Sequence, residues 1–279
     1  MGALWSLFGS SHSLSSVVLA DEETEYDDDD ATPAPFHANT LTLDALTYLE
    51  VGKNPFVLPL LERIILPHVE TLHLESVPFR VVHRLISASA DLDDLWLSDI
   101  TSRPANSSHS PVALSALCTI YLKDCPWLLD HIHAPQLKSL HLNNSHLAAN
   151  SGAPLRALIK RSSPELTSLR LQRIDIGDEE ILGCLEGLPD LDSLSLYACT
   201  ISDTVLRALA VPPSLERDTG WLLPRLKVFQ CHQNAYVTPQ AVIALLASRE
   251  SSRKSPIKGS ASFVDDLSDE DVETLSSRF

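Results

Sequence analysis

The sequence of 279 residues predicts an α/β fold in which short parallel strands alternate with helices along one solenoid. Three observations lead to this prediction. A hydrophobic frame of six residues, apolar-x-x-apolar-x-apolar, recurs eight times in order. In five of the eight copies a proline stands two residues before the frame, and stretches with helical spacing lie between the frames. One such frame arises easily by chance in a leucine-rich chain, but eight in order with a shared proline indicate about eight repeats.

Each frame predicts one short strand. The frames begin at residues 46, 69, 92, 117, 137, 166, 191 and 226, so successive copies are 23, 23, 25, 20, 29, 25 and 35 residues apart. Apolar residues at alternating positions, as in "LDSLSL" at residues 191–196, indicate a strand with one buried face. Stacked repeats of this kind form a parallel sheet, which we expect on the concave side of the solenoid.

The segments between the frames predict helices on the convex side. "DTVLRALA" follows Ser202 and "PQAVIALLA" follows Thr238, and serine and threonine are favoured helix caps. Pro239 suits the first position of a helix. "PFRVVHRLISAS" and "PLRALIKRS" have the same helical spacing. One strand and one helix cannot bury their apolar sides alone, so neighbouring repeats must stack.

The two ends of the chain differ from the repeat region in composition. We expect one domain over residues 40–249, preceded by an acidic disordered segment at 1–39 and followed by an acidic disordered tail at 250–279. The net charge of −16 disfavours binding to nucleic acid, because that requires a basic surface.

Composition also bears on the compartment. The chain has no run of eighteen apolar residues, and its first twenty residues lack the basic start of a signal peptide. "MGALWS" fits the pattern for myristoylation of Gly2, but one acyl chain anchors only weakly and the nearby acidic run would be repelled by anionic lipid. The five cysteines lack C-x-x-C spacing, which favours a reducing compartment over a disulfide framework. We expect a cytoplasmic or nuclear protein that does not bind membranes.

Signals for catalysis or metal binding are weak. His131 and His133 form an H-x-H pair without a second cluster, so we expect them to be solvated turn residues rather than metal ligands. Nucleophile-elbow, phosphate-loop and zinc-protease motifs are absent from the sequence. The sequence predicts no enzyme, no cofactor and no metal site.

The frames resemble a known family. "LPHVETLHL", "LPDLDSLSL" and "LPRLKVF", together with "LERIILP" and the uneven repeat lengths, are similar to intracellular leucine-rich-repeat proteins of the ribonuclease-inhibitor-like type. More narrowly, they resemble the repeat region of fungal F-box proteins. The resemblance covers about residues 40–249 and implies a horseshoe with a parallel concave sheet. Extracellular relatives usually place Asn three residues past the last frame position, and six of the eight copies here lack it.

The F-box itself is not found. "VLPLLERIIL" at residues 57–66 lies between two frames spaced 23 residues apart and is better explained as part of a repeat. The resemblance implies a monomeric substrate-recognition protein of an F-box ubiquitin ligase, which would bind a ubiquitination target. A Skp-type adaptor is expected as a partner only if an F-box lies upstream. The alternative is a leucine-rich-repeat scaffold or adaptor with no link to ubiquitin.

The strand positions between the frame leucines predict where a protein partner would bind, because they point away from the core. The central positions are Glu50, His73, Trp96, Tyr121, His141, Arg170, Ser195 and Gln230. Tryptophan, tyrosine and arginine dominate interface energetics, although exposed aromatics also simply suit strands. The predicted binding residues are His73, Trp96, Tyr121, Lys123, His141, Asn143, Arg170, Gln172 and Tyr197.

Overall fold

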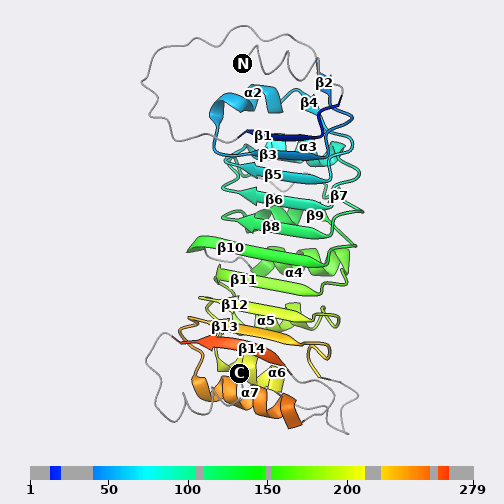
Figure 1. Cartoon of the computed structure of the whole chain (residues 1–279). Helices are drawn as coiled ribbons and strands as arrows, with labels where there is room; N and C mark the ends of the chain where they lie inside the picture. The colour runs from blue at the N-terminus through cyan, green and yellow to red at the C-terminus, as the bar shows by residue number, and fades with distance from the viewer. Residues whose placement is uncertain are drawn as a thin grey trace. The chain divides into compact units, whose positions relative to one another are not determined.

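A computed structural model describes residues 13–19, 40–104, 110–148, 152–210, 221–251 and 257–263. The fold is α/β with a large sheet of ten strands, which confirms the predicted class and is compatible with a solenoid (Figure 1). The chain divides into two compact units, residues 1–119 with 131–133 and residues 120–130 with 134–279. The predicted domain at residues 40–249 has parts in both units.

The first unit contributes four strands to the large sheet, in the order β1-β3-β5-β6, and they pair in parallel. Their bounds are β1 Ser16–Leu19, β3 Tyr48–Val51, β5 Thr71–Glu75 and β6 Asp94–Ser98. Two small parallel sheets join β2 (Leu41–Thr42) to β4 (Ile64–Ile65) and β7 (Val112–Ala113) to β9 (Ile132–His133). The helices are η1 (Pro55–Val57), α2 (Leu58–Leu61) and α3 (Phe79–Ala88).

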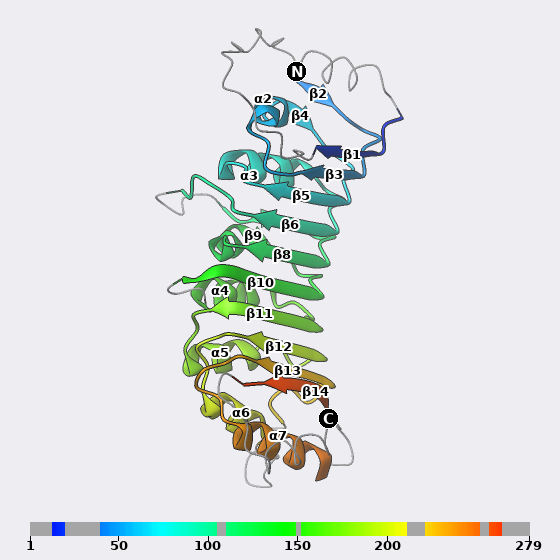
Figure 2. The same cartoon turned by 60° about the vertical axis from the view of Figure 1, so that its left-hand side comes forward.

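The second unit continues the strand order as β8-β10-β11-β12-β13-β14. The strands are β8 Thr119–Lys123, whose first residue belongs to the first unit, β10 Ser139–Ala148, β11 Ser168–Ile174, β12 Ser193–Tyr197, β13 Val228–His232 and β14 Lys258–Ser262. The helices are η2 Pro126–His131, α4 Gly152–Ser162, α5 Asp178–Leu185, α6 Asp203–Ala210 and α7 Pro239–Ser251. Helices α4–α7 all lie on one side of strands β10–β14 (Figure 2). No helix in the described part of the chain is long and apolar enough to cross a membrane.

All eight predicted frames form strands of the large sheet. Each of their 24 frame side chains is at most 2% exposed. The register keeps equivalent positions side by side, so that Leu72 pairs with Leu49 on one side and Leu95 on the other. Burying a side chain of this size contributes about 1.5–3 kcal/mol. The frames therefore supply the core behind the strands of each unit.

The predicted helices are also present. α3, α4, α6 and α7 lie where helical spacing was found, and α7 begins at Pro239 as expected. Ser202 and Thr238 are helix caps: the N–H of Thr204 donates to Ser202 Oγ at 3.2 Å, and that of Ala241 donates to Thr238 Oγ1 at 3.3 Å. The caps satisfy N–H groups that the first turn of a helix leaves without partners.

Two strands lie inside segments that were predicted to be disordered, so that prediction is wrong for these residues. β1 belongs to the 1–39 segment and β14 to the 250–279 tail; the remainder of both segments, apart from a few flanking residues, lies outside the described residues. In β1, Val17 and Leu19 pair with Leu49 and Val51, which makes Leu14-x-x-Val17-x-Leu19 a further copy of the frame. In β14 the corresponding positions are Gly259 and Ala261. These small residues carry no hydrophobic pattern that could have been recognised.

Three arginines on helices donate hydrogen bonds to backbone carbonyls of the preceding segment. Arg249, 0% exposed, donates to the carbonyl oxygens of Leu209, Leu222 and Leu223 and lies 4.2 Å from the centre of the Trp221 ring. Burial lowers its pKa to about 10, so it stays charged at neutral pH. In the same way, Arg84 donates to Ile64 and Leu61, and Arg161 to Leu129. The carbonyls at the ends of α2, η2 and α6 thus gain donors from the next helix.

The turn that leaves each strand has a recurring conformation. In six of the eight frames the second residue after the frame has a positive φ between 49° and 59°, and none of the six is glycine: Ser76, Asp99, Asp124, Arg173, Ala198 and Gln233. A side chain in this left-handed region costs about 1–2 kcal/mol. Ala198, with φ 49°, has no polar side chain that could offset this cost by a hydrogen bond.

We predict opposite effects for the same substitution at two alanines. Ala198→Gly should stabilise the protein by about 0.5 kcal/mol, because glycine adopts positive φ without a clash. Ala208→Gly, inside α6 where alanine is favourable, should destabilise it by about 1 kcal/mol. Urea denaturation of both variants tests this. Destabilisation by both would show that the turn at Ala198 is not strained.

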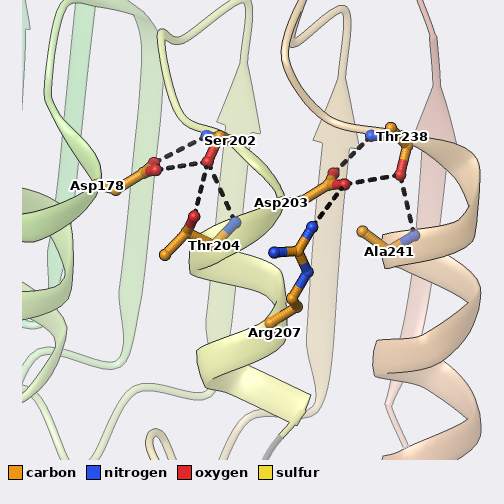
Figure 3. A network of polar contacts seen from close by, with 7 residues as sticks. All are labelled: Asp178, Ser202, Asp203, Thr204, Arg207, Thr238 and Ala241. Atoms are coloured by element: carbon orange, nitrogen blue, oxygen red, sulfur yellow. Dashed lines mark hydrogen bonds and ion pairs between the residues drawn. The ribbon is translucent and has the colours of Figure 1, made fainter.

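Neighbouring helix starts are connected by an aspartate ladder (Figure 3). Asp178 accepts hydrogen bonds from the N–H and the hydroxyl of Ser202, at 2.8 and 2.5 Å. Asp203 accepts equivalent bonds from Thr238, at 2.7 and 2.9 Å. In both cases the aspartate is the first residue of one helix and the serine or threonine caps the next. One carboxylate therefore satisfies the backbone of the following repeat and orients its cap.

Removing one rung should be costly. Asp203→Ala should destabilise the protein by about 2 kcal/mol, because two charge-assisted hydrogen bonds are lost and the Thr238 N–H loses its acceptor. The matched control is Arg207→Ala, which removes only the exposed ion pair to Asp203 at 3.3 Å and should cost less than about 0.5 kcal/mol. Denaturant unfolding of both variants measures the difference. Equal losses of stability in the two variants would mean that Asp203 stabilises the protein through its ion pair with Arg207 and not through its hydrogen bonds to Thr238.

Candidate binding surface

The surface of interest is the outward face, which we define as the alternating strand positions that lie between the buried frame residues. Among the central positions, Trp96 (43% exposed) and Arg170 are exposed, and Glu50, His73, Tyr121, His141 and Gln230 are partly exposed. Ser195 differs from the expectation because it is buried at 7% exposure. It is a small side chain flanked in register by the longer Arg170 and Gln230.

In the first unit, an aromatic cluster covers the outward positions of β3, β5 and β6. The His73 ring lies between Tyr48, at 5.4 Å and edge-on, and Trp96, at 5.1 Å. Tyr48 donates its hydroxyl hydrogen to Glu50 at 2.5 Å, and the Glu50 carboxylate is 3.8 Å from His73 Nδ1. Tyr48 was not among the predicted residues, because it precedes the central position of its frame.

The charges in this cluster follow from its contacts. The hydrogen bond to Glu50 raises the pKa of Tyr48. Burial lowers the pKa of His73, while Glu50 and Asp94 oppose that change. The imidazole is therefore neutral near pH 7 and packs as an aromatic ring under Trp96, which orients the indole outward.

In the second unit, Tyr121, His141 and Asn143 come together as predicted. The Tyr121 and His141 rings are 4.6 Å apart in an edge-on arrangement, and Asn143 Nδ2 donates to the Tyr121 hydroxyl at 3.3 Å. Arg170 is the register partner of His141 on the next strand. Burial, aided by the charge of Arg170, lowers the pKa of His141 to about 4. This part of the face thus presents one permanent cation beside a neutral imidazole.

A third aromatic–histidine pair lies on β12 and β13, where Tyr197 and His232 are 6.5 Å apart. Tyr197 donates to the Gln233 side chain at 2.6 Å. Both ring nitrogens of His232 are engaged, with Ser262 Oγ at 3.0 Å and Ser260 Oγ at 2.9 Å. Gln172 is the register partner of Tyr197. Polar contacts therefore tie the last three strands together on the outward side.

The structure corrects the interpretation of His131. It was expected to be a solvated turn residue, but it is buried at 4% exposure, with its ring 4.7 Å from that of Phe79. His133 is partly exposed, and its carbonyl accepts from the Leu114 N–H at 2.8 Å. Among the described residues, no group of three His, Cys, Asp or Glu side chains is placed to hold a metal ion.

The cysteines are poor candidates for chemistry. All five are free thiols, and Cys125, Cys184, Cys199 and Cys231 are buried. Burial raises the pKa of Cys184 and Cys231 to about 12 and that of Cys199 to about 11. A thiol that stays protonated at neutral pH is a weak nucleophile.

On the helical side of the second unit, an open hollow of about 540 Å³ lies beside α4 and α5. Its charged residues have both signs, and its two carboxylates are already paired: Glu165 with Lys138 at 2.9 Å and Asp190 with Arg225 at 2.8 Å. The hollow lacks a concentration of one kind of group that would define a ligand.

Comparison with protein-family models and with curated proteins finds no match to this chain.

We predict that His141 makes stability depend on pH. Its pKa is below that of an unfolded histidine, so between about pH 6.5 and pH 4 the unfolded chain binds a proton that the folded chain does not. The stability that neutral His141 contributes is therefore present above this window and lost as pH falls through it. We expect a loss of about 1 kcal/mol from this group, since solvent partly screens it.

The measurement is urea unfolding at pH 7 and pH 5 for the wild type and His141→Gln. The variant should lose less stability on acidification, while the carboxylates contribute equally to both proteins. Identical losses would show that His141 titrates normally, and an NMR titration of its ring, with an expected midpoint near 4, checks the same point directly.

Proposed function

We propose that this protein is a leucine-rich-repeat interaction module that binds a protein partner on the outward, concave face of its sheet, as the substrate-recognition part of an F-box type ubiquitin ligase. The observation that carries the binding role is the arrangement around Trp96. A large indole, 43% exposed, is held on a strand by the His73 ring in a parallel sheet. Aromatic side chains that are oriented before binding lose little entropy on association and often dominate interfaces.

Three features of the outward face support a protein partner rather than a small molecule. The outward positions extend over several strands of each unit, and most of their side chains are half-exposed. They combine aromatic rings with amide, hydroxyl and charged groups. Aromatic–histidine contacts occur on β3–β6 in the first unit and on β8–β10 and β12–β13 in the second, so each unit offers potential contacts on several strands. Stable protein interfaces bury about 800 Å² on each partner, which requires a surface of this kind.

The link to ubiquitin rests on the resemblance of the frames to fungal F-box proteins. Residues 57–66 are the only stretch that faintly resembles an F-box. Most of this stretch lies in η1, α2 and β4, between the strands of two frames, which favours the second candidate, a scaffold without a link to ubiquitin. Co-purification of the full-length gene product with a Skp-type adaptor separates the two candidates. Absence of the adaptor from a complex that retains the target would favour the scaffold.

Trp96→Ala should weaken partner binding by about 2 kcal/mol or more, roughly thirtyfold, and leave the melting temperature within about 2 °C of the wild type. The matched control in the same unit is Phe56→Ala, an exposed aromatic (60%) in η1 and outside the outward face, which should not affect binding. Tyr121 is half-buried against His141, so Tyr121→Ala should lower both stability and binding.

The readouts are thermal unfolding and quantitative capture of a cross-linked partner by each variant. Capture that survives Trp96→Ala and Tyr121→Ala while stability falls would contradict the proposal, because the aromatic rings would then serve only to pack the sheet.

A further inference from the structure

The outward face of the second unit has an unusual charge. Its described outward positions on β8 and β10–β14 include Lys123, Arg170 and Lys258, and none of them is Asp or Glu. The chain as a whole has 37 acidic and only 21 basic residues. On the outward positions of the first unit the opposite holds: Glu50, Glu75 and Asp94 are present, and no lysine or arginine is found among those described. Acidic side chains are therefore absent from one part of the face only.

Arg170 occupies a central position on this cationic part. It is exposed on β11, with His141 as its register partner on one side and Ser195 on the other. Among the described residues, no carboxylate lies within ion-pair distance of Arg170. Its positive charge also lowers the pKa values of His141, on the neighbouring strand β10, and of His232, on β13 two strands away. The field of Arg170 therefore extends across the face without an internal counter-ion.

The neutral side chains around Arg170 add hydrogen-bond donors. A row of register partners, Asn143, Gln172, Tyr197, His232 and Ser262, crosses five adjacent strands. The Asn143 and Gln172 amides carry N–H groups that can donate to carboxylate oxygens, whereas Tyr197 and His232 already bind Gln233, Ser260 and Ser262. A guanidinium binds a carboxylate with two parallel hydrogen bonds. Strands about 4.8 Å apart make this row about 19 Å long, which matches six extended peptide residues.

We propose that the outward face of the second unit binds an extended acidic peptide segment of its protein partner, with Arg170 as the central carboxylate-binding residue. This inference rests on the proposed function, since it uses the same face, and it specifies the chemistry of the partner. A few cations spread over six strands suit a segment with a few carboxylates. A nucleic acid strand has a phosphate at each nucleotide and would place more negative charge on this face than these cations can pair.

The test is fluorescence anisotropy of the full chain at 50 mM salt with a labelled octapeptide in which Glu alternates with Ser. The same octapeptide with Gln in place of Glu controls for charge, and an eight-nucleotide oligothymidine represents nucleic acid. The acidic peptide should bind and the neutral peptide should not. Arg170→Gln and Lys258→Gln should each weaken binding about fivefold or more, and a rise to 200 mM salt should also weaken it.

The control variant is Lys160→Gln, which removes an exposed lysine from α4 on the helical side of the same unit. It should leave the affinity unchanged, and all three variants should unfold at the wild-type temperature within about 1 °C. Equal weakening by Lys160→Gln, or tighter binding of the oligothymidine than of the acidic peptide, would overturn the proposal.

The two proposals can fail separately. If the acidic peptide does not bind while partner capture still depends on Trp96, the acidic-peptide proposal is wrong and the proposed function stands. If the peptide binds through Arg170 but capture of the partner is insensitive to Trp96→Ala, the proposed role of Trp96 is wrong and the acidic-peptide proposal stands.

Discussion

The burial of three side chains from each of the eight frames is the constraint on which the remaining structure depends. A strand of four or five residues cannot bury these side chains alone, so it needs an equivalent strand beside it in the same register. A slip of one residue would turn the leucines outward and the polar residues inward. The register that protects Leu72 between Leu49 and Leu95 therefore also sets His73 between Glu50 and Trp96. The core and the outward face therefore have a common origin.

On the helical side, polar groups perform the equivalent role between neighbouring repeats. Asp203 binds the cap of the next helix, and Arg249 binds the carbonyl end of the previous one. Helices α6 and α7 thus satisfy some of their terminal backbone groups with side chains from each other. Such contacts make the stability of one repeat depend on its neighbours, which is the energetic behaviour expected of a stacked array.

Most of the fold could be predicted from the sequence, because the leucine frames and helical spacing record burial directly. The elements and contacts that were not predicted have no such sequence pattern. β14 has Gly259 and Ala261 at its inward positions, and the frame of β1 begins 32 residues before the next, outside the spacing of most copies. The contact between His73 and Tyr48 could be predicted only with the strand register. The burial of Arg249 could be predicted only with the positions of the carbonyls that surround it. The central positions of the candidate surface were predictable, but their mutual contacts were not.

The frames are separated by 20 to 35 residues, yet paired strands keep equivalent positions side by side. Differences in repeat length are therefore absorbed between the strands, away from the outward face. An in-frame insertion or deletion of codons in those segments would leave the order of the surface side chains intact, while a point substitution at an outward strand position would alter one surface side chain without disturbing the core. The chain can thus acquire new outward side chains and new connecting segments through independent mutations.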